Sequence, residues 1–402
     1  MFSQNSLDIK GVVVDANNKP IQYASVSLPT MFLGTSTTEE GKFMLSLSNS
    51  DFDSNDIIKV SSLGHETEKI TIQDYIDLKD KVIVIGGGNI KSVKKEKQIV
   101  KPISATKAKS KLKVKSKSIA QPITKPKSAK DYIELAYKNL EKNTINTPHE
   151  LKMIYRRFST EDEKARFLVE HCINILDKGP LNGAYSGVEI VSGRKSEDHR
   201  LVKKKMNGHA VNQIGKKSPL REGINTDEYN WKVSGYSSYD GEQIAIVEGW
   251  HKQETPRYVR YYVGTKTYGV YKIETKQLNA VYVYQKDENG KLYLSYHKRT
   301  RTGRGKLTEA DKKKLKTNKN TVKESYKHEA FVIGVKKLMP NKYDRSVYRV
   351  YHEDIGDIKT AYEPSFWRKL SIPPNTAFYN ESIEELETIS NLPIQKQFRR
   401  VN

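Results

Sequence analysis

The chain has 402 residues, of which 36% are hydrophobic and 29% are charged, so it is long enough for two or three domains with a very polar surface. No run of about eighteen apolar residues occurs, which excludes a membrane-spanning helix. The net charge is +22, but residues 91–130 carry +13 of it and residues 298–319 carry +8, so we expect near-neutral folded bodies with two basic appendages.

Residues 1–88 predict a β-sandwich. Short apolar runs each end at a Gly, Pro, Asn or Asp cluster, as in an antiparallel all-β domain. These runs are Ile9–Asp15, Ala24–Leu28, Lys42–Leu47, Ile57–Gly64 and Val82–Ile85. Their order resembles the carboxypeptidase-D regulatory-like domain, a transthyretin-like fold common in Bacteroidota envelope proteins. Since that domain is the non-catalytic partner in carboxypeptidases, the resemblance implies a cell-envelope location and no peptidase.

The N-terminal residues Met1–Gln4 resemble the end of a Bacteroidota secretion signal whose charged and apolar parts are missing. We therefore expect a secreted, periplasmic protein whose signal peptide is missing from or trimmed in this sequence; the alternative is a genuine short tail. The single cysteine, Cys172, excludes an internal disulfide. Because Cys172 lies far from the N-terminus, it also does not provide the lipidated cysteine of a lipoprotein.

Residues 89–128 predict a disordered, Lys-rich linker after a glycine hinge at Gly86–Gly88. Its lysines can contact an anionic membrane surface, and the candidates are Lys107, Lys109, Lys111, Lys113, Lys115 and Lys117. A solvated spacer is the alternative. Nucleic acid is an unlikely partner, because the aromatic residues that stack on bases are absent from the linker.

Residues 129–402 predict a helix capped by Ser128, followed by a large antiparallel β domain. Leu151–Phe158 and Arg166–Leu176 flank a polar turn and indicate a hairpin. Further strands are expected at Gln243–Glu248, Tyr258–Val263, Gly269–Glu274, Val281–Gln285, Leu292–His297, Phe331–Val335 and Ser346–Tyr351. Lys298–Lys319 is expected to be a long loop with one helical turn after Thr308. The chain is thus mainly β, and the helix followed by amphipathic strands resembles the half-barrel of lipoprotein-carrier proteins.

The C-terminal tail contains Tyr362–Trp367, Ile383–Glu387 and Leu392–Phe398. It resembles the C-terminal signature of uncharacterised Bacteroidota proteins that have the same N-terminal sandwich. Phe366, Trp367 and Phe398 form a candidate aromatic anchor for a partner. The alternative is that these rings pack the tail onto its own domain.

The sequence predicts no catalytic residue, metal or cofactor. His251 and Glu254 have the spacing of two metal ligands, but one such match is expected by chance. His171 and Cys172 are adjacent in a strand and point to opposite faces, so they do not form a catalytic pair. Glu161–Glu163 indicates a solvated hairpin tip, and no role is assigned to the mixed charges of Arg194–Asp198.

These observations favour a non-catalytic cell-envelope protein. We expect a soluble periplasmic accessory subunit or interaction module, whose partner is an outer-membrane or periplasmic protein complex and whose linker lets the sandwich reach away from the C-terminal body. The alternative is a carrier of lipid or another apolar ligand. A continuous apolar cavity lined by alternate residues of Tyr258–Val263 and Val281–Gln285 would distinguish the carrier.

Overall fold

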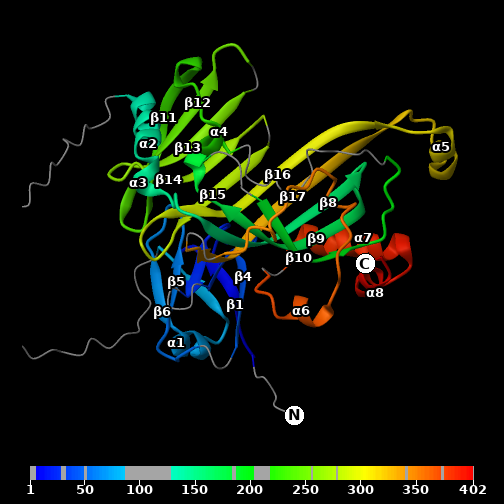
Figure 1. Ribbon diagram of the computed structural model, residues 1–402, viewed down its shortest axis with the longest axis horizontal. Helices are drawn as coiled ribbons and strands as arrows, with labels where there is room; N and C mark the ends of the chain where they lie inside the picture. The colour runs from blue at the N-terminus through cyan, green and yellow to red at the C-terminus, as the bar shows by residue number, and fades with distance from the viewer. Residues whose placement is uncertain are drawn as a thin grey trace, which may run out of the picture.

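The computed structural model describes residues 6–28, 33–48, 52–86, 128–182, 187–202, 218–254, 257–277, 279–339, 343–372 and 375–401. The fold is mainly β, as the sequence predicts (Figure 1). Within these ranges, none of the helices combines the length and the apolar composition that a membrane span requires.

The N-terminal unit is the expected sandwich. Its elements are β1 (Ser6–Val14), β2 (Ser25–Leu28), β3 (Leu33–Ser36), β4 (Lys42–Ser48), β5 (Ile57–Ser61), β6 (Glu68–Thr71), α1 (Ile72–Asp77) and β7 (Val82–Val84). One sheet has the order β4-β1-β7 and the other β3-β2-β5-β6. Alternate residues of both sheets, among them Ile9, Val26, Phe43 and Ile58, form a shared core, as the alternating pattern requires.

The C-terminal unit is built on one antiparallel sheet of ten strands, in the order β10-β9-β8-β17-β16-β15-β14-β13-β12-β11. The strands are β8 (His149–Glu161), β9 (Lys164–Asp177), β10 (Gly187–Lys195), β11 (Tyr229–Tyr239), β12 (Glu242–His251), β13 (Tyr258–Gly264), β14 (Val270–Thr275), β15 (Ala280–Lys286), β16 (Leu292–Lys306) and β17 (Thr321–Lys337). The helices are α2 (Ala129–Lys138), α3 (Leu140–Asn143), α4 (Pro219–Glu222), α5 (Glu309–Leu315), α6 (Pro364–Arg368), α7 (Ala377–Ser390) and α8 (Ile394–Val401).

Helix α2 begins where the sequence predicts. The Ser128 side chain accepts a hydrogen bond from the Asp131 N–H, and the Asp131 carboxylate accepts one from the Ser128 N–H, which completes a capping box. The stripe formed by Ile133, Ala136 and Leu140 then packs on the core of β11–β15.

The cross-strand register assigns the side chains to two faces of this sheet. One row across the strands consists of Tyr282, His297, Ala330, Tyr155, His171 and Gly193. Because Tyr282 lies in the core under α2, we call the side of this row the α2 face. The adjacent row consists of Val283, Tyr296, Phe331, Ile154, Cys172 and Ser192. We call its side the sandwich face, because Tyr23 of the N-terminal sandwich stacks on Tyr296 there. Helices α6–α8 cover the same face over β8–β10.

Two segments differ from the sequence prediction. Lys298–Lys319 is not a long loop: β16 continues to Lys306, and α5 has seven residues. The alternation of Arg and Thr gives this strand no apolar face, so the hydrophobic pattern of the sequence does not predict it. Its stability comes instead from backbone pairing with β17 and from β-branched Thr. Ser346–Tyr351 is not a strand, since its backbone pairs with β10 only between Arg349 and Val188 and its valines stay exposed.

Candidate functional site

The N-terminal sandwich is docked onto the C-terminal sheet (Figure 1), so the expectation that it reaches away from the C-terminal body is wrong. Strands β16 and β17 separate beyond the pair Tyr296–Phe331. Strand β3 approaches β17 in the resulting split, where Leu33 pairs with Gly334. The β3-β2-β5-β6 sheet and the C-terminal strands therefore form one continuous sheet of fourteen strands.

Side chains seal this junction on the sandwich face. The rings of Tyr23 and Tyr296 stack with their centroids 4.5 Å apart. The Tyr23 hydroxyl donates to Glu39 at 3.0 Å, and Glu39 also binds the Lys298 ammonium. Burial, followed by the Glu39 charge, raises the pKa of Tyr23, so the phenol remains a neutral donor.

A second contact joins the sandwich to the other end of the sheet. Asp240 and Gly241 have φ angles of 50° and 75°, the positive values that a two-residue hairpin turn between β11 and β12 requires. The turn projects the Asp240 carboxylate toward the sandwich, where Lys59 lies 3.4 Å away and the Thr67 hydroxyl donates at 3.0 Å. Burial would raise the pKa of Asp240, but the Lys59 charge and these hydrogen bonds hold it below its usual value.

Two hollows lie along the junction. The first, the junction pocket, has a volume of about 320 Å³ and lies between loop 15–25, residues 61–65 and strands β13–β15. Its wall combines rings and polar groups, including Tyr23, His65, Tyr262, Lys272 and Gln285. The second, the split groove, has a volume of about 620 Å³. Its lining residues are Ser27, Gly34, Lys59, Lys286, Asp287, Glu288, Tyr293, Val332, Gly334, Val335, Lys336 and Lys337.

A partly exposed surface of aromatic and charged residues extends from the junction pocket along β12–β14. Register places Tyr262 and Lys272 in the row of Val283, hence on the sandwich face. Alternation along β13 puts Arg260 and Tyr258 on that face too. Trp250 pairs with Tyr258, with ring centroids 5.5 Å apart. We call Trp250, Tyr258, Arg260 and Tyr262 the ladder surface.

The charges of the ladder surface are held in fixed positions. Arg260 lies 2.7 Å from Glu248 and 3.1 Å from Glu274, while Lys272 binds Glu274 at 2.6 Å. The guanidinium of Arg260 also lies 5.8 Å from the Tyr258 ring. Trp250 keeps 42% of its surface exposed. The ladder surface therefore combines an accessible indole ring with the ordered guanidinium of Arg260.

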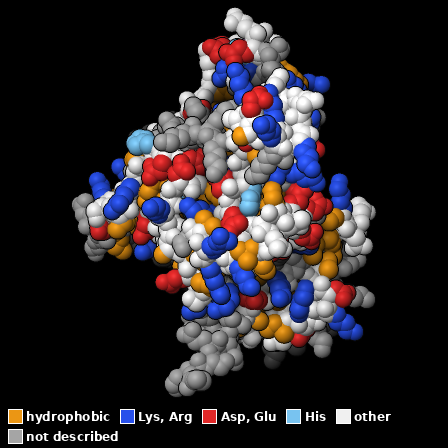
Figure 2. All heavy atoms as spheres, turned by 90° about the vertical axis from the view of Figure 1, so that its right-hand side faces the viewer, with side chains coloured by type: hydrophobic (Ala, Val, Ile, Leu, Met, Phe, Trp, Pro, Cys, Tyr) orange, Lys and Arg blue, Asp and Glu red, His pale blue; other side chains and the backbone are white. Residues whose placement is uncertain are grey.

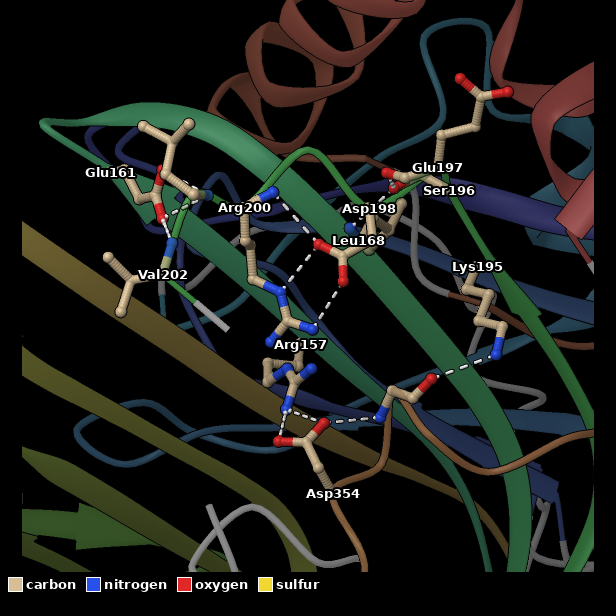
Figure 3. A network of polar contacts seen from close by, with 12 residues as sticks. Arg157, Glu161, Leu168, Lys195, Ser196, Glu197, Asp198, Arg200, Val202 and Asp354 are labelled. Carbon is tan, nitrogen blue, oxygen red and sulfur yellow. Dashed lines mark hydrogen bonds and ion pairs between the residues drawn. The ribbon is translucent and has the colours of Figure 1, made fainter. Parts of the chain in front are cut away.

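A separate polar network lies under the α2 face (Figure 3). Arg157 is fully buried and donates to both carboxylate oxygens of Asp354 at 2.7 and 2.6 Å. The Gly356 N–H also donates to Asp354 at 2.7 Å. Nearby, Arg200 pairs with Asp198 at 2.8 Å. These contacts fix segments 195–202 and 354–356 against β8, and we assign them a structural role.

Two buried histidines on the α2 face are neutral. Burial, then the charges of Lys195 and Arg157, lowers the pKa of His171 to about 3. Burial, then Arg299, lowers the pKa of His297 to about 3 as well. Within the described ranges, no group of three His, Cys, Asp or Glu side chains is arranged to hold a metal ion.

The residues that the sequence singled out fall into three groups. The linker lysines Lys107, Lys109, Lys111, Lys113, Lys115 and Lys117 lie outside the described residues, as do Met1–Gln4. Trp367 and Phe398 are buried, and Phe366 packs beside Trp367 on the sandwich face. These rings therefore belong to the chain's own core rather than to an exposed anchor.

The remaining motifs have local explanations. His251 accepts hydrogen bonds from the Gln253 and Glu254 N–H groups, so His251 and Glu254 form a turn rather than a metal pair. His171 and Cys172 do point to opposite faces. Glu161, expected on a solvated tip, is buried, because its carboxylate accepts the N–H groups of Leu201 and Val202, each at 3.0 Å.

Sequence reasoning missed two sets of residues. The ladder surface was visible in part, since Tyr258, Arg260 and Tyr262 alternate along a predicted strand. Their association with Trp250 depends on strand register, which one sequence does not specify. Arg194, to which the sequence assigned no role, lies in β10 and binds Glu170 at 2.6 Å.

Comparisons with known proteins give one match to a protein family. Residues 9–85 match the CarboxypepD_reg-like domain, in agreement with the resemblance of the N-terminal sandwich. A comparison with the curated proteins found no match.

Solved structures with similar arrangements share little sequence with this chain. A putative outer membrane lipoprotein-sorting protein domain from Vibrio parahaemolyticus is 7% identical with a TM-score of 0.28, over 54% of this chain and 96% of that one. A LolA superfamily protein from Nitrosomonas europaea is 13% identical with a TM-score of 0.26, over 55% and 97%. A DUF1329 family protein from Desulfovibrio piger is 11% identical with a TM-score of 0.25, over 54% and 99%. TM-scores below 0.5 carry no functional weight, so the function proposed below is derived from this chain's own geometry.

Proposed function

We propose that this chain is a non-catalytic cell-envelope protein that binds a protein partner through the ladder surface. The partner is a subunit of an outer-membrane or periplasmic complex. The observation that carries the proposal is the grouping of exposed Trp250 with half-buried Tyr258 and Arg260 on a rigid sheet. Trp, Tyr and Arg are the residues most enriched among those that dominate protein–protein binding energies.

The ladder surface is suited to this role because it is ordered before a partner binds. Glu248 and Glu274 fix the Arg260 guanidinium, so little side-chain entropy is lost on association. The junction pocket borders Tyr262 and Lys272 and offers space for a protruding partner side chain. Since both domains line this pocket, the sandwich contributes to recognition as well as to stability.

The envelope location is supported by the N-terminal sandwich. The match of residues 9–85 to the CarboxypepD_reg-like domain supports the domain assignment, and the envelope location is proposed from the resemblance that this domain carries. In that setting the chain acts as an accessory subunit, and its linker gives a further contact with an anionic membrane surface.

The ladder surface is tested by purifying the tagged native protein from detergent-solubilised membranes. Trp250→Ala and Arg260→Ala should each reduce a stoichiometric envelope partner at least tenfold, since such residues contribute about 2 kcal/mol or more. Leu181→Ala is the matched control, because Leu181 is 55% exposed and lies elsewhere. A partner retained by both ladder variants, or lost equally with the control, contradicts the proposal.

A carrier of an apolar ligand is the second candidate, and the split groove is the observation that favours it. On the α2 face, Tyr261, Val263 and Tyr282 fill the core under α2. On the sandwich face, Tyr262, Val283 and Gln285 line the junction pocket, but its wall is partly polar, so the described part of the chain does not contain the continuous apolar cavity that would distinguish a carrier. The split groove instead offers Val332, Val335 and Tyr293 as apolar walls. Solvent extraction and mass spectrometry of the native protein should detect a lipid that Val335→Trp displaces. Protein purified without lipid eliminates this candidate.

A further inference from the structure

The β16–β17 hairpin extends beyond the neighbouring strands as an arm with α5 at its tip (Figure 1). Strand β15 pairs with β16 as far as Arg299, and β8 pairs with β17 as far as Glu324. Beyond these points the described strands form a two-stranded ribbon, in which Arg304 pairs with Lys323 and Lys306 with Thr321. We call residues 301–323 the arm.

The arm has a defined shape, unlike a solvated tail. Val322 on the ribbon and Leu307, where the ribbon meets α5, are buried, and the Leu307 N–H donates to the Asn320 carbonyl at 2.9 Å. Thr308 and Asp311 form a capping box that starts α5. The charges of the arm are therefore held at fixed positions on a projecting element.

The exposed charged side chains of the arm are mostly cationic, with Glu309 as the exposed acid. They include Arg301, Arg304, Lys306, Lys313, Lys316, Lys319 and Lys323. Two of these cations have acidic neighbours on the β8–β9 hairpin: Lys319 and Lys323 reach Asp162 and Glu163 at 3.5 and 2.9 Å. In Figure 2, which faces this end of the molecule, Lys and Arg side chains are interspersed with Asp and Glu. Arg304 also stands opposite Lys323, and like charges in that position destabilise a ribbon.

We infer that the arm is a docking element for an anionic lipid surface. A rigid tip with several exposed cations is complementary to a layer of lipid phosphates, to which each Lys or Arg adds favourable energy within a Debye length. No aromatic residue occurs between Lys298 and Ser325, so the stacking platform of a single-stranded nucleic-acid site is missing. This inference goes beyond the partner proposed above, because it rests on a different part of the sheet.

The test is co-sedimentation of the full chain with vesicles of phosphatidylcholine containing 30% phosphatidylglycerol. In all proteins compared, six linker lysines are replaced by Gln, which removes much of the linker's contribution to vesicle binding. These substitutions are Lys107→Gln, Lys109→Gln, Lys111→Gln, Lys113→Gln, Lys115→Gln and Lys117→Gln. The arm variant is Lys306→Glu, Lys313→Glu and Lys316→Glu. The matched control is Lys232→Glu, Lys252→Glu and Lys266→Glu, which changes the net charge equally at exposed positions on β11 and beside β12 and β13.

We expect the arm variant to bind at least tenfold more weakly than its parent and the control to bind within threefold. Circular dichroism and thermal unfolding verify that all proteins remain folded. Equal losses in arm and control variants would show that net charge alone drives binding, and would overturn the inference. Binding of duplex DNA by the parent at the affinity measured for the vesicles, lost in the arm variant, would overturn the lipid assignment.

Discussion

The two faces of the sheet neutralise their buried cations in different ways, and the consecutive residues Arg156 and Arg157 show the contrast. On the sandwich face, the row Lys298, Glu329, Arg156, Glu170 and Arg194 alternates in sign across five strands. On the α2 face, Arg299, His328, Arg157 and Lys195 lie in one row without a carboxylate. Arg157 is instead neutralised by Asp354, which lies outside the strands.

This difference means that one face depends on strand pairing and the other on a loop. Glu170 is fully buried between Arg156, at 3.4 Å, and Arg194, at 2.6 Å. Burial would raise the pKa of Glu170, but these two guanidinium groups hold it below its ordinary value. Removal of one partner from a buried ion pair leaves an uncompensated charge, which costs far more than the pair itself contributes.

The largest effect is expected for Glu170→Ala. It removes the carboxylate that the buried Arg156 and Arg194 share and should lower the free energy of unfolding by about 3–5 kcal/mol, measured by urea denaturation at pH 7. Asp354→Ala affects one arginine and should cost less than Glu170→Ala. Glu309→Ala on exposed α5 is the control and should change stability by under about 0.5 kcal/mol. Equal costs for Glu170→Ala and Asp354→Ala would remove the distinction between the two faces.

The faces should also respond to acid in different pH windows. On the α2 face, the pKa values of His171 and His297 are about 3 when folded, against about 6.5 when unfolded. Below pH 6.5 only the unfolded chain takes up these protons. The stability is therefore complete above pH 6.5 and falls by about 1.4 kcal/mol per pH unit for each histidine as the pH decreases toward 3. Glu170 loses its contribution only below about pH 4.3, since its folded pKa is depressed below that unfolded value.

Urea denaturation between pH 7 and 5 isolates the α2 face. His297→Asn should reduce the pH dependence of the unfolding free energy by about half compared with the unmodified chain. Glu170→Gln should leave the slope in this range unchanged, because Glu170 remains ionised there in both states. A slope that His297→Asn does not alter would contradict the assignment of this pH window to the buried histidines.

The sequence predicted the elements whose stability depends on a local pattern. The Ser128 cap, the hairpin of β8 and β9 and the strands rich in Val, Ile and Tyr are confirmed. Such elements have an apolar periodicity or turn chemistry of their own. The arm was missed because Arg and Thr alternate there without an apolar face, and Ser346–Tyr351 resembled a strand but lacks a neighbour that would bury its valines.

The candidate site was harder to predict because it depends on contacts between distant residues. Arg156 and Glu170 belong to different strands, and Asp354 is almost two hundred residues from Arg157. Docking of the sandwich depends on the split between β16 and β17, which follows from sheet geometry. By contrast, Trp367 and Phe398 were identified as a group by their aromatic character, while their burial depended on helices that cover the sandwich face.

The smallest effect is expected at the rim of the sandwich face, where α6 covers Cys172. The Trp367 indole N–H donates to the Ser192 hydroxyl at 3.0 Å, and Trp367 shares a core with Cys172. Burial raises the pKa of the Cys172 thiol to about 11, so labelling by a thiol reagent requires the region to open.

Ser192→Ala leaves the buried indole N–H unpaired, at a cost of about 1–2 kcal/mol, and should accelerate labelling about tenfold. Ser346→Ala at an exposed position is the control. If Ser192→Ala leaves the labelling rate unchanged, α6 does not control access to Cys172, and the protection of the sandwich face resides in the strands alone.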